Sequence, residues 1–574
     1  MNLKTLRACQ NLSDLARVLR VSPKGLSYIL YKIPVHLKYT QFEMPKKSGG
    51  TRTISSPDRR LKFVQSQLAR LLYACQREIV PVEEHAKRVL SHGFQKKRGL
   101  SIHTNAGKHT NRRYVLNVDL EGFFPSLNFG RVRGYFIKNR DFQLPEAVAT
   151  VVAQIVCHEN ELPQGAPTSP IVSDLMARVM DVHLARMASR LGCTYSRYVD
   201  DLTFSTNLAE FPSTLAVEDQ ATGTWIAGQE LRARLWRQGF SLNDQKTRMQ
   251  VRSSRQEVTG LIVNEFVNVR GEVEASNRIL LYSLIKKGSC FQKDPQSGAI
   301  SPMSVAQLGG RLSHQFQTKA ARHGFRSARE LEKAGEAIPK FYRDYASYIN
   351  YSNFHANELP TIVCEGVTDA IYLKSALRML HAKFPKLAGE SGGKYVSDIR
   401  FFGYSRHHKA ATKLSGGAGD LQHFVRDYSK IVHPFHAGGQ LKPVIVFVDN
   451  DKATNAIWSY IKEKTGSKAA VDGSDPFYHI DRNLFVVAVP GKVGAAERVV
   501  EDLFDGATKA MQWNGTTVDL NQKRGHPPAK GKMSKERFAT KIVRDQRHKI
   551  DFSGFEPVLK SFSDIINIKL TGSK

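Results

Sequence analysis

The ten residues "SRYVDDLTFS" (196–205) carry two adjacent aspartates, Asp200 and Asp201, in the middle of a β-rich run. A strand with one buried face alternates apolar and polar residues, and this pair breaks the alternation. Two neighbouring acids fit either the turn of a β-hairpin, where aspartate is common, or a metal site. Residues elsewhere in the chain decide between these two interpretations.

A third aspartate favours the metal site. The segment "YVLNVDL" (114–120) has the pattern of a strand, and Asp119 lies near its end. Nucleotide addition uses two divalent ions about 3.5–4 Å apart, and Mg²⁺ is held by a few carboxylates together with substrate phosphates. Such a reaction needs carboxylates from two neighbouring strands. Asp119 and the Asp200–Asp201 pair therefore predict a polymerase site with two Mg²⁺ ions.

The charge of the chain indicates a nucleic-acid partner. The 574 residues include 84 Lys and Arg against 53 Asp and Glu, which gives a formal net charge of +31. Neutralisation of phosphates by lysine and arginine drives binding to nucleic acid regardless of its sequence. The length predicts three or four domains.

Cysteine usage and hydropathy indicate a soluble, cytoplasmic protein with no membrane partner. The six cysteines are scattered, with no CxxC pair, which argues against a disulfide framework or a zinc knuckle. The N-terminus lacks the continuous apolar segment of a signal peptide. No uncharged stretch is long enough to cross a bilayer.

The remaining pattern predicts a change of architecture near residue 351. Residues 39–57 resemble a hairpin with the basic turn "KKSGG", and a long stretch from about 215 to 350 is predicted to be mainly helical. After that, the apolar segments "TIVCEG", "LKPVIVFVDND" and "NLFVVAVP" alternate with helical segments. Such alternation predicts a mostly parallel α/β sheet, with active groups beyond the carboxyl ends of its strands.

Three motifs give the first half a family resemblance. "VDLEGFFPS" (118–126), "LPQGAPTSP" (162–170) and "RYVDD" (197–201) resemble, in order and spacing, the first palm motif, the nucleotide-positioning motif and the YxDD hairpin of reverse transcriptases. "SHGFQKKRGLSIHTNAGKHT" (91–110) and "VTGLIVN" (258–264) further resemble segments of bacterial retron reverse transcriptases. The resemblance implies a right-hand fold of fingers, palm and helical thumb, in an α+β arrangement.

The resemblance also implies roles for single residues. Asp119 and Asp200 would be the main metal ligands, with Asp201 as a weaker, supporting acid. The nucleotide would be bound by four further residues: Arg52 at its triphosphate, Phe124 as the gate that excludes a ribose 2′-hydroxyl, Gln164 in its positioning loop, and Lys246 near the leaving phosphate. Alternatively, Phe124 is a core residue, and Arg52 and Lys246 are solvated surface charges.

Retron enzymes imply particular partners. They recognise a structured non-coding RNA, prime from the 2′-hydroxyl of a guanosine in it, and polymerise dNTPs into a branched RNA–DNA molecule, msDNA. A thumb at residues 261–350 would grip an RNA stem, since RNA helices are recognised mainly through shape, phosphates and 2′-hydroxyls. Association of several copies into a homo-oligomer stays open, because no heptad pattern or repeat indicates an interface.

Acids also end the strands predicted in the second half. Glu365 follows "TIVC", and Asp449 and Asp451 follow "VIVFV", spaced so that both reach one face of a strand end. This pattern resembles the Toprim fold of topoisomerases, primases and OLD-type nucleases. It implies a site for one or two Mg²⁺ ions, with Mn²⁺ as an alternative, and Glu365 as a general acid/base or further ligand. Glu501 or Asp502 would complete the site, and Lys535 would be its basic residue. Alternatively, these acids cap the following helices.

The two resemblances together predict a fusion. Residues 1–260 would form fingers and palm, 261–350 the thumb, and 351–574 a Toprim-like effector that acts as a nuclease on DNA or RNA. Retron systems pair such an effector with their DNA in antiphage defence, so the complex would restrain the nuclease until infection. Two alternatives remain: the Toprim region processes the enzyme's own product, or it is a non-catalytic scaffold that binds nucleic acid.

Overall fold

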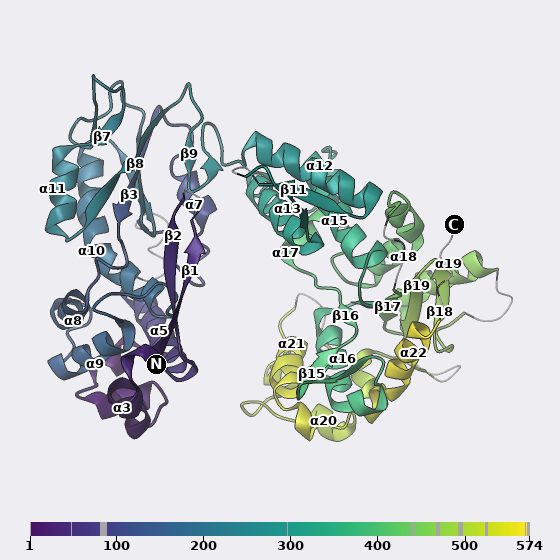
Figure 1. The fold of residues 1–574 in the computed structure, drawn as a ribbon. Helices are drawn as coiled ribbons and strands as arrows, with labels where there is room; N and C mark the ends of the chain where they lie inside the picture. The colour runs from purple at the N-terminus through teal and green to yellow at the C-terminus, as the bar shows by residue number, and fades with distance from the viewer. Residues whose placement is uncertain are drawn as a thin grey trace. The chain divides into compact units, whose positions relative to one another are not determined.

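The chain divides at Arg270 into two units, Met1–Arg270 and Gly271–Lys574 (Figure 1). In this computed structural model the described residues are 2–46, 49–80, 89–294, 297–437, 439, 442–466, 471–491, 497–522, 526–568 and 570. The three-part division expected from the sequence stays a prediction. Among the described helices, none is long and apolar enough to span a membrane.

A four-stranded antiparallel sheet forms the centre of the first unit. Its strand order is β4-β5-β3-β8, from β3 (Tyr114–Glu121), β4 (Thr194–Tyr198), β5 (Asp201–Thr206) and β8 (Ser241–Val251). Leu116, Val118 and Phe204 of this sheet share a core with α10 (Ser169–Arg190) and α5 (Arg59–Ile79). In the register between β3 and β5, Asp119 lies opposite Asp201.

Helices and hairpins surround this sheet. The expected hairpin forms from β1 (Tyr39–Pro45) and β2 (Thr51–Pro57), although residues 47 and 48 of its turn lie outside the described residues. The other helices of the unit are α1 (Leu3–Arg7), α2 (Leu12–Val18), α3 (Pro23–Tyr31), α4 (Val35–Lys38), α7 (Ile102–Gly107), α8 (Phe129–Lys138), α9 (Glu146–Val156) and α11 (Gln229–Arg237).

The prediction that residues 215–350 are mainly helical is wrong for its first third. That part contains β6 (Ala216–Glu218), β7 (Trp225–Ala227), β8, β9 (Glu257–Val258) and β10 (Leu261–Ile262). Strand β8 lies at the edge of the sheet and most of its side chains are not buried. Its sequence, "SLNDQKTRMQV", therefore lacks the apolar alternation by which a strand is recognised, and backbone pairing with β3 defines it instead.

A five-stranded sheet forms the centre of the second unit, in the order β16-β13-β17-β19-β18. The strands β13 (Thr361–Cys364), β16 (Arg400–Phe401), β17 (Val444–Val448) and β19 (Leu484–Ala488) are parallel, and β18 (Tyr478–Asp481) is antiparallel to β19. Every residue of β13, β17 and β19 is buried, as expected for a parallel sheet covered on both faces. The predicted mostly parallel sheet is therefore present.

The two faces of this sheet bury alternate residues in two separate cores. One core contains Ile362, Ile445 and Phe485 with α16 (Val367–Leu380), η7 (Phe538–Arg544) and α22 (Glu556–Ile566). The other contains Val363, Val446 and Val486 with α18 (Ala418–Val432) and α19 (Asn455–Thr465). The period-two alternation is the one that a β-strand imposes.

The helical segment expected to be the thumb shares the second of these cores. It consists of α12 (Gly271–Lys287), β11 (Cys290–Lys293), β12 (Ile300–Met303), α13 (Val305–Ala320), η2 (Ala321–His323), α14 (Ala328–Lys333), α15 (Lys340–Asn350) and the π-helix η3 (Tyr351–His355). Phe316 of α13 is fully buried, and its ring lies 4.9 Å from that of Tyr345 and 5.8 Å from that of His407. The helical segment and the sheet therefore form one unit.

The remaining elements of the second unit are short. They are η4 (His381–Lys383), β14 (Ala388–Ser391), β15 (Lys394–Ser397), α17 (Arg406–Ala411), η5 (Lys452–Thr454), η6 (Val500–Leu503), α20 (Gly506–Ala510), β20 (Thr517–Val518), β21 (Lys532–Met533), α21 (Lys535–Arg537), η8 (Arg547–Lys549) and η9 (Ser553–Phe555).

Replacement of Phe316 by alanine tests whether this shared core holds the second unit together. Phe316→Ala should lower the free energy of unfolding of that unit by about 3–5 kcal/mol, because it removes a fully buried ring and leaves a cavity. Urea unfolding of the full chain measures the change. The control Tyr282→Ala removes an exposed ring of α12 and should change it by less than about 0.5 kcal/mol. Equal effects of the two substitutions would contradict the shared core.

Candidate active sites

The paired aspartates lie at a tight two-residue hairpin turn. Tyr198 pairs with Asp201, so Val199 and Asp200 form the turn between β4 and β5. Val199 has a φ of 62°, a conformation that a β-branched residue rarely adopts. A Cβ at Gly93 would lie 2.8 Å from the backbone nitrogen of Val199, so only glycine allows this approach. The turn is therefore strained, and Gly93 packs closely against it.

A buried ion network holds the strained turn. The Arg197 guanidinium is fully buried, 2.8 Å from Asp181 Oδ2 and 3.0 Å from Asp174 Oδ1, and it donates a 3.0 Å hydrogen bond to the carbonyl of Val199. Sequence reasoning missed this network. The spacing of Asp174 and Asp181 in α10 would have indicated this network, since residues seven apart lie on one face of a helix.

Asp119, Asp200 and Asp201 lie close enough beside this turn to affect one another's ionisation, and their role as metal ligands stays a prediction. The pKa of Asp200 is raised by burial and by the charge of Asp119. Asp201 as a whole residue is exposed, yet burial of its carboxyl group and the charges of Asp200 and Asp119 raise its pKa to about 7. The Lys246 ammonium lies 3.0 Å from Asp119 Oδ2 and offsets part of this repulsion. The β8 strand thus brings Lys246 to the acids.

This donor set suits a hard divalent cation. Carboxylate oxygens are what Mg²⁺ prefers, and mutual repulsion makes their ionised forms costly without a cation. Among the described residues, no group of three metal-ligating side chains is arranged closely enough to hold an ion by itself. Mg²⁺ is commonly bound by one or two carboxylates plus substrate phosphates, so the arrangement fits an ion that arrives with a nucleotide.

Besides Lys246 on β8, the residues predicted to contact the nucleotide come from β2 and two loops. The Ser55 N–H donates a 2.7 Å hydrogen bond to the Gln164 carbonyl, which ties the "LPQGAPTSP" loop to the strand that carries Arg52. Arg52 is exposed, and its charge acts to lower the pKa of Asp200. Phe124 is half-buried, with its ring 6.2 Å from that of Phe94. The roles of these residues stay predictions.

A second group of acids lies at the carboxyl ends of β13 and β17. Burial and the charges of Asp369 and Asp451 raise the pKa of Glu365, and Glu365 Oε2 has no hydrogen-bond partner among the described residues. Burial and the charges of Asp369 and Glu365 raise the pKa of Asp449 to about 8. The acids predicted on the two strands are therefore close enough to repel one another.

The structure places Glu501 and Asp502 differently. Glu501 is buried, and burial raises its pKa despite Lys535, whose ammonium lies 3.2 Å from Glu501 Oε2. Asp502 instead accepts a hydrogen bond from the Val499 N–H and lies 3.3 Å from Lys509, at the surface. Glu501 therefore adds its charge to the acids of the sheet, with Lys535 beside it, whereas Asp502 is exposed and has Val499 and Lys509 as its partners.

Two acids of this group also cap helices. Asp451 Oδ1 accepts a hydrogen bond from the Ala453 N–H at the start of η5. Asp369 accepts one from the Gly366 N–H in the first turn of α16, yet it is buried beside Glu365 and Asp449. From the sequence, Asp369 could be either an accessory acid or a first-turn helix residue, and the first-turn position was favoured. A capping acid can thus also add charge to the cluster.

Comparisons with known proteins agree with the first unit's motifs. Residues 44–263 match the family described as "Reverse transcriptase (RNA-dependent DNA polymerase)". The chain is 36% identical over 262 residues to the retron Mx65 reverse transcriptase of Myxococcus xanthus, covering 42% of this chain and 55% of that protein. It is 29% identical over 261 residues to the retron Ec86 reverse transcriptase of Escherichia coli, covering 45% and 73%. It spans about half the length of the Myxococcus relatives.

Residues 44–263 are therefore similar to the reverse transcriptase family, and over this part the chain is similar to retron enzymes. The solved structure of telomerase from Candida albicans, with a fragment of telomeric RNA, aligns over 54% of this chain and 59% of that chain. Its TM-score is 0.30 and its sequence identity is 12%, too low to carry an argument.

Asp449→Asn should change how stability depends on pH. The carboxyl at 449 has a pKa of about 8 in the folded chain, against an ordinary 3.8. The folded form therefore keeps a proton that the unfolded form has lost, and this group's contribution to stability falls as pH rises from about 4 to about 8. Asparagine cannot ionise. In urea unfolding without divalent ions, Asp449→Asn should gain stability relative to wild type between pH 5 and pH 9, by about 1 kcal/mol or more.

Added Mg²⁺ serves as the control for this measurement. At pH 9 the ion should stabilise the wild type more than the asparagine variant, because it would offset the repulsion among the carboxylates. The same pH dependence in both proteins would contradict the crowding of acids around Asp449.

Proposed function

We propose that the first unit is an RNA-directed DNA polymerase of a retron. It would use a cognate structured non-coding RNA as template and primer, and dNTPs as substrates, to make a branched RNA–DNA product. The observation that carries this proposal is the meeting of Asp119, Asp200 and Asp201 at one strained turn, with Lys246 beside them. The similarity to retron enzymes supports the choice of substrate.

The side chains would divide the work of nucleotide addition. Asp119 and Asp200 would hold Mg²⁺, with Asp201 in support. When bound, the ion neutralises charge on the attacking and leaving oxygens. Lys246 would stabilise the leaving phosphate, and Arg52 would bind the triphosphate. Gln164 and Phe124 would position the nucleotide, with Phe124 excluding a 2′-hydroxyl.

We further propose that the second unit carries a Toprim-like, metal-dependent nuclease that serves as an effector in antiphage defence. The mostly parallel sheet, the acids at the ends of β13 and β17, and the Glu501–Lys535 pair support this proposal. Glu365, Asp449, Asp451 and Glu501 would hold Mg²⁺ or Mn²⁺. Lys535 would pair with the Glu501 carboxylate and partly neutralise its charge. Glu365 would also exchange a proton with the cleaved strand.

Two other functions would use the same acids differently. The second unit could trim the polymerase product, or it could bind nucleic acid without cutting it. The raised pKa values of Glu365 and Asp449 favour catalysis over a scaffold, since strongly perturbed groups gather at functional sites.

Asp200→Asn should abolish DNA synthesis. Extension of an RNA-primed template with dNTPs and Mg²⁺ should slow about 1,000-fold, because metal-held charge stabilisation is worth several kcal/mol. The control Asp244→Asn changes an exposed acid of β8 that pairs with Arg232, and it should leave the rate within a factor of two or three. Full synthesis by Asp200→Asn would refute the assignment of the polymerase site.

Asp449→Asn combined with Asp451→Asn should separate the two activities. The doubly changed protein should still make DNA, but it should lose metal-dependent cleavage in vitro and toxicity in infected cells. Asp502→Asn, which changes an exposed acid next to Glu501, is the matched control and should keep both. Toxicity equal to wild type in the double variant would refute the effector proposal, and a shortened or unprocessed DNA product would favour trimming.

A further inference from the structure

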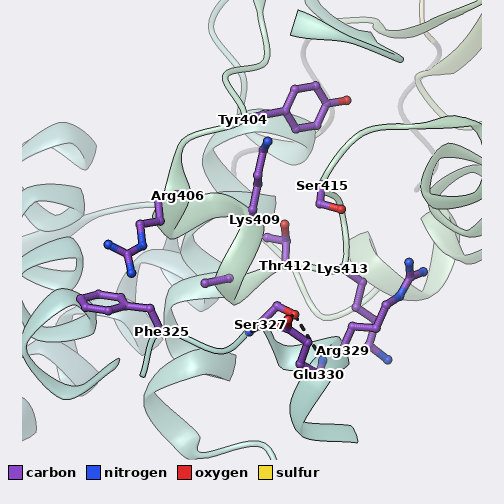
Figure 2. Close-up of a pocket in the computed structure, with 11 residues that line it drawn as sticks. Phe325, Ser327, Arg329, Glu330, Tyr404, Arg406, Lys409, Thr412, Lys413 and Ser415 are labelled. Carbon is purple, nitrogen blue, oxygen red and sulfur yellow. Dashed lines mark hydrogen bonds between the residues drawn. The ribbon is translucent and has the colours of Figure 1, made fainter. Parts of the chain in front are cut away.

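A cavity of about 410 Å³ opens between the helical segment and the α/β sheet of the second unit. Figure 2 shows its walls, with Arg406 beside Phe325 and Lys409 directed toward Tyr404. Its lining includes four cations and one carboxylate, and consists of Phe325, Ser327, Arg329, Glu330, Tyr404, Arg406, Lys409, Ala410, Thr412, Lys413 and Ser415. The size lies in the range typical of sites for small ligands.

Two of the four cations are available to a ligand. The Arg406 guanidinium lies over the Phe325 ring, 4.0 Å from its centre, and stacking of this kind leaves the N–H groups at the guanidinium edge able to donate. The Lys409 ammonium lies 6.0 Å from the Tyr404 ring centre. Among the described residues, neither Arg406 nor Lys409 has a carboxylate within ion-pair distance. The cavity therefore has uncompensated positive charge.

The other charged groups of the lining are already engaged. Arg329 pairs with Asp420, and the Lys413 ammonium lies 2.9 Å from a Glu332 carboxylate oxygen. The Glu330 carboxylate accepts hydrogen bonds of 2.6 and 2.7 Å from the backbone and side chain of Ser327. These pairs fix the walls of the cavity and leave Arg406 and Lys409 as its anion-binding groups.

One wall of the cavity is joined to the end of β13, where Glu365 lies. The Tyr404 hydroxyl donates a hydrogen bond to the Cys364 carbonyl. Gly417 lies two residues beyond Ser415, and its N–H donates a 2.9 Å hydrogen bond to the Glu365 carbonyl. The cavity wall that carries Tyr404 is thus hydrogen-bonded to the end of β13, next to Glu365.

We propose that this cavity binds a phosphate of a nucleic-acid strand through Arg406 and Lys409. A planar, fixed guanidinium and a nearby ammonium suit a phosphate, which accepts several charge-assisted hydrogen bonds. The volume exceeds what inorganic phosphate alone would fill, so the cavity has room for part of the attached nucleoside. The net charge of +31 favours a polyanion as the source. This binding does not require that Glu365 or Asp449 catalyse any reaction.

Protection of Lys409 from acylation tests the proposal in the full chain. The full chain is acylated in three separate reactions that contain a 5′-phosphorylated thymidine dinucleotide, inorganic phosphate or uncharged thymidine. Mass spectrometry then measures the acylation rate of each lysine. The dinucleotide should slow acylation of Lys409 at least fivefold, and thymidine should not. Lys462, an exposed lysine of α19, should react at the same rate throughout. Protection by inorganic phosphate at the same concentration would assign the site to free phosphate and overturn the nucleic-acid source.

The substitution Arg406→Ala gives a second test of the same proposal. It should raise the dinucleotide concentration needed to protect Lys409 about tenfold, while the melting temperature stays unchanged, because Arg406 is exposed. The control Arg343→Ala removes an exposed arginine of α15 away from the cavity lining and should leave protection as in wild type. Absence of protection in the wild type, or equal protection in Arg406→Ala, would overturn the proposal.

Discussion

Carboxylates that meet at the ends of strands repel one another, and each unit of this chain brings several of them together. In the first unit the register of β3 and β5 sets Asp119 opposite Asp201. In the second, parallel strands place Glu365 and Asp449 at the same edge of the sheet. Each group has one lysine beside it, Lys246 or Lys535. Burial and the neighbouring carboxylates raise the pKa values of Asp201 and Asp449, so their ionised forms are costly in both groups.

The rest of each unit holds these acids in place. Beside the turn between β4 and β5, Arg197 and its two aspartate partners are buried, and Gly93 permits the close approach to Val199. The strain of the turn is thereby offset by a buried ion network, whose loss would leave uncompensated charges. In the second unit the helical segment shares a core with the sheet, so the element expected to grip RNA is fixed to the sheet that carries the second group of acids.

The sequence predicted the parts that chemistry constrains and missed those that packing decides. The positions of Asp119, Asp200 and the acids at 365 and 449 near strand ends could be predicted because apolar strands that end in acids leave a local pattern. Their roles as metal ligands stay predictions. Strand β8 was missed because its exposed side chains follow no apolar alternation. The attachment of the helical segment to the α/β sheet was also missed. The contact between Phe316 and His407 joins residues far apart in the sequence, and it leaves no signal in the local sequence around either residue.

Purification of the full chain from cells that also carry its flanking DNA, followed by sequencing of the nucleic acid that accompanies it, tests the proposal that the first unit makes DNA joined to RNA. With the wild type we expect one abundant RNA covalently linked to DNA through a 2′-oxygen. This molecule should be missing with Asp200→Asn. RNA without attached DNA in the wild-type preparation, or the same branched molecule with Asp200→Asn, would contradict the proposal.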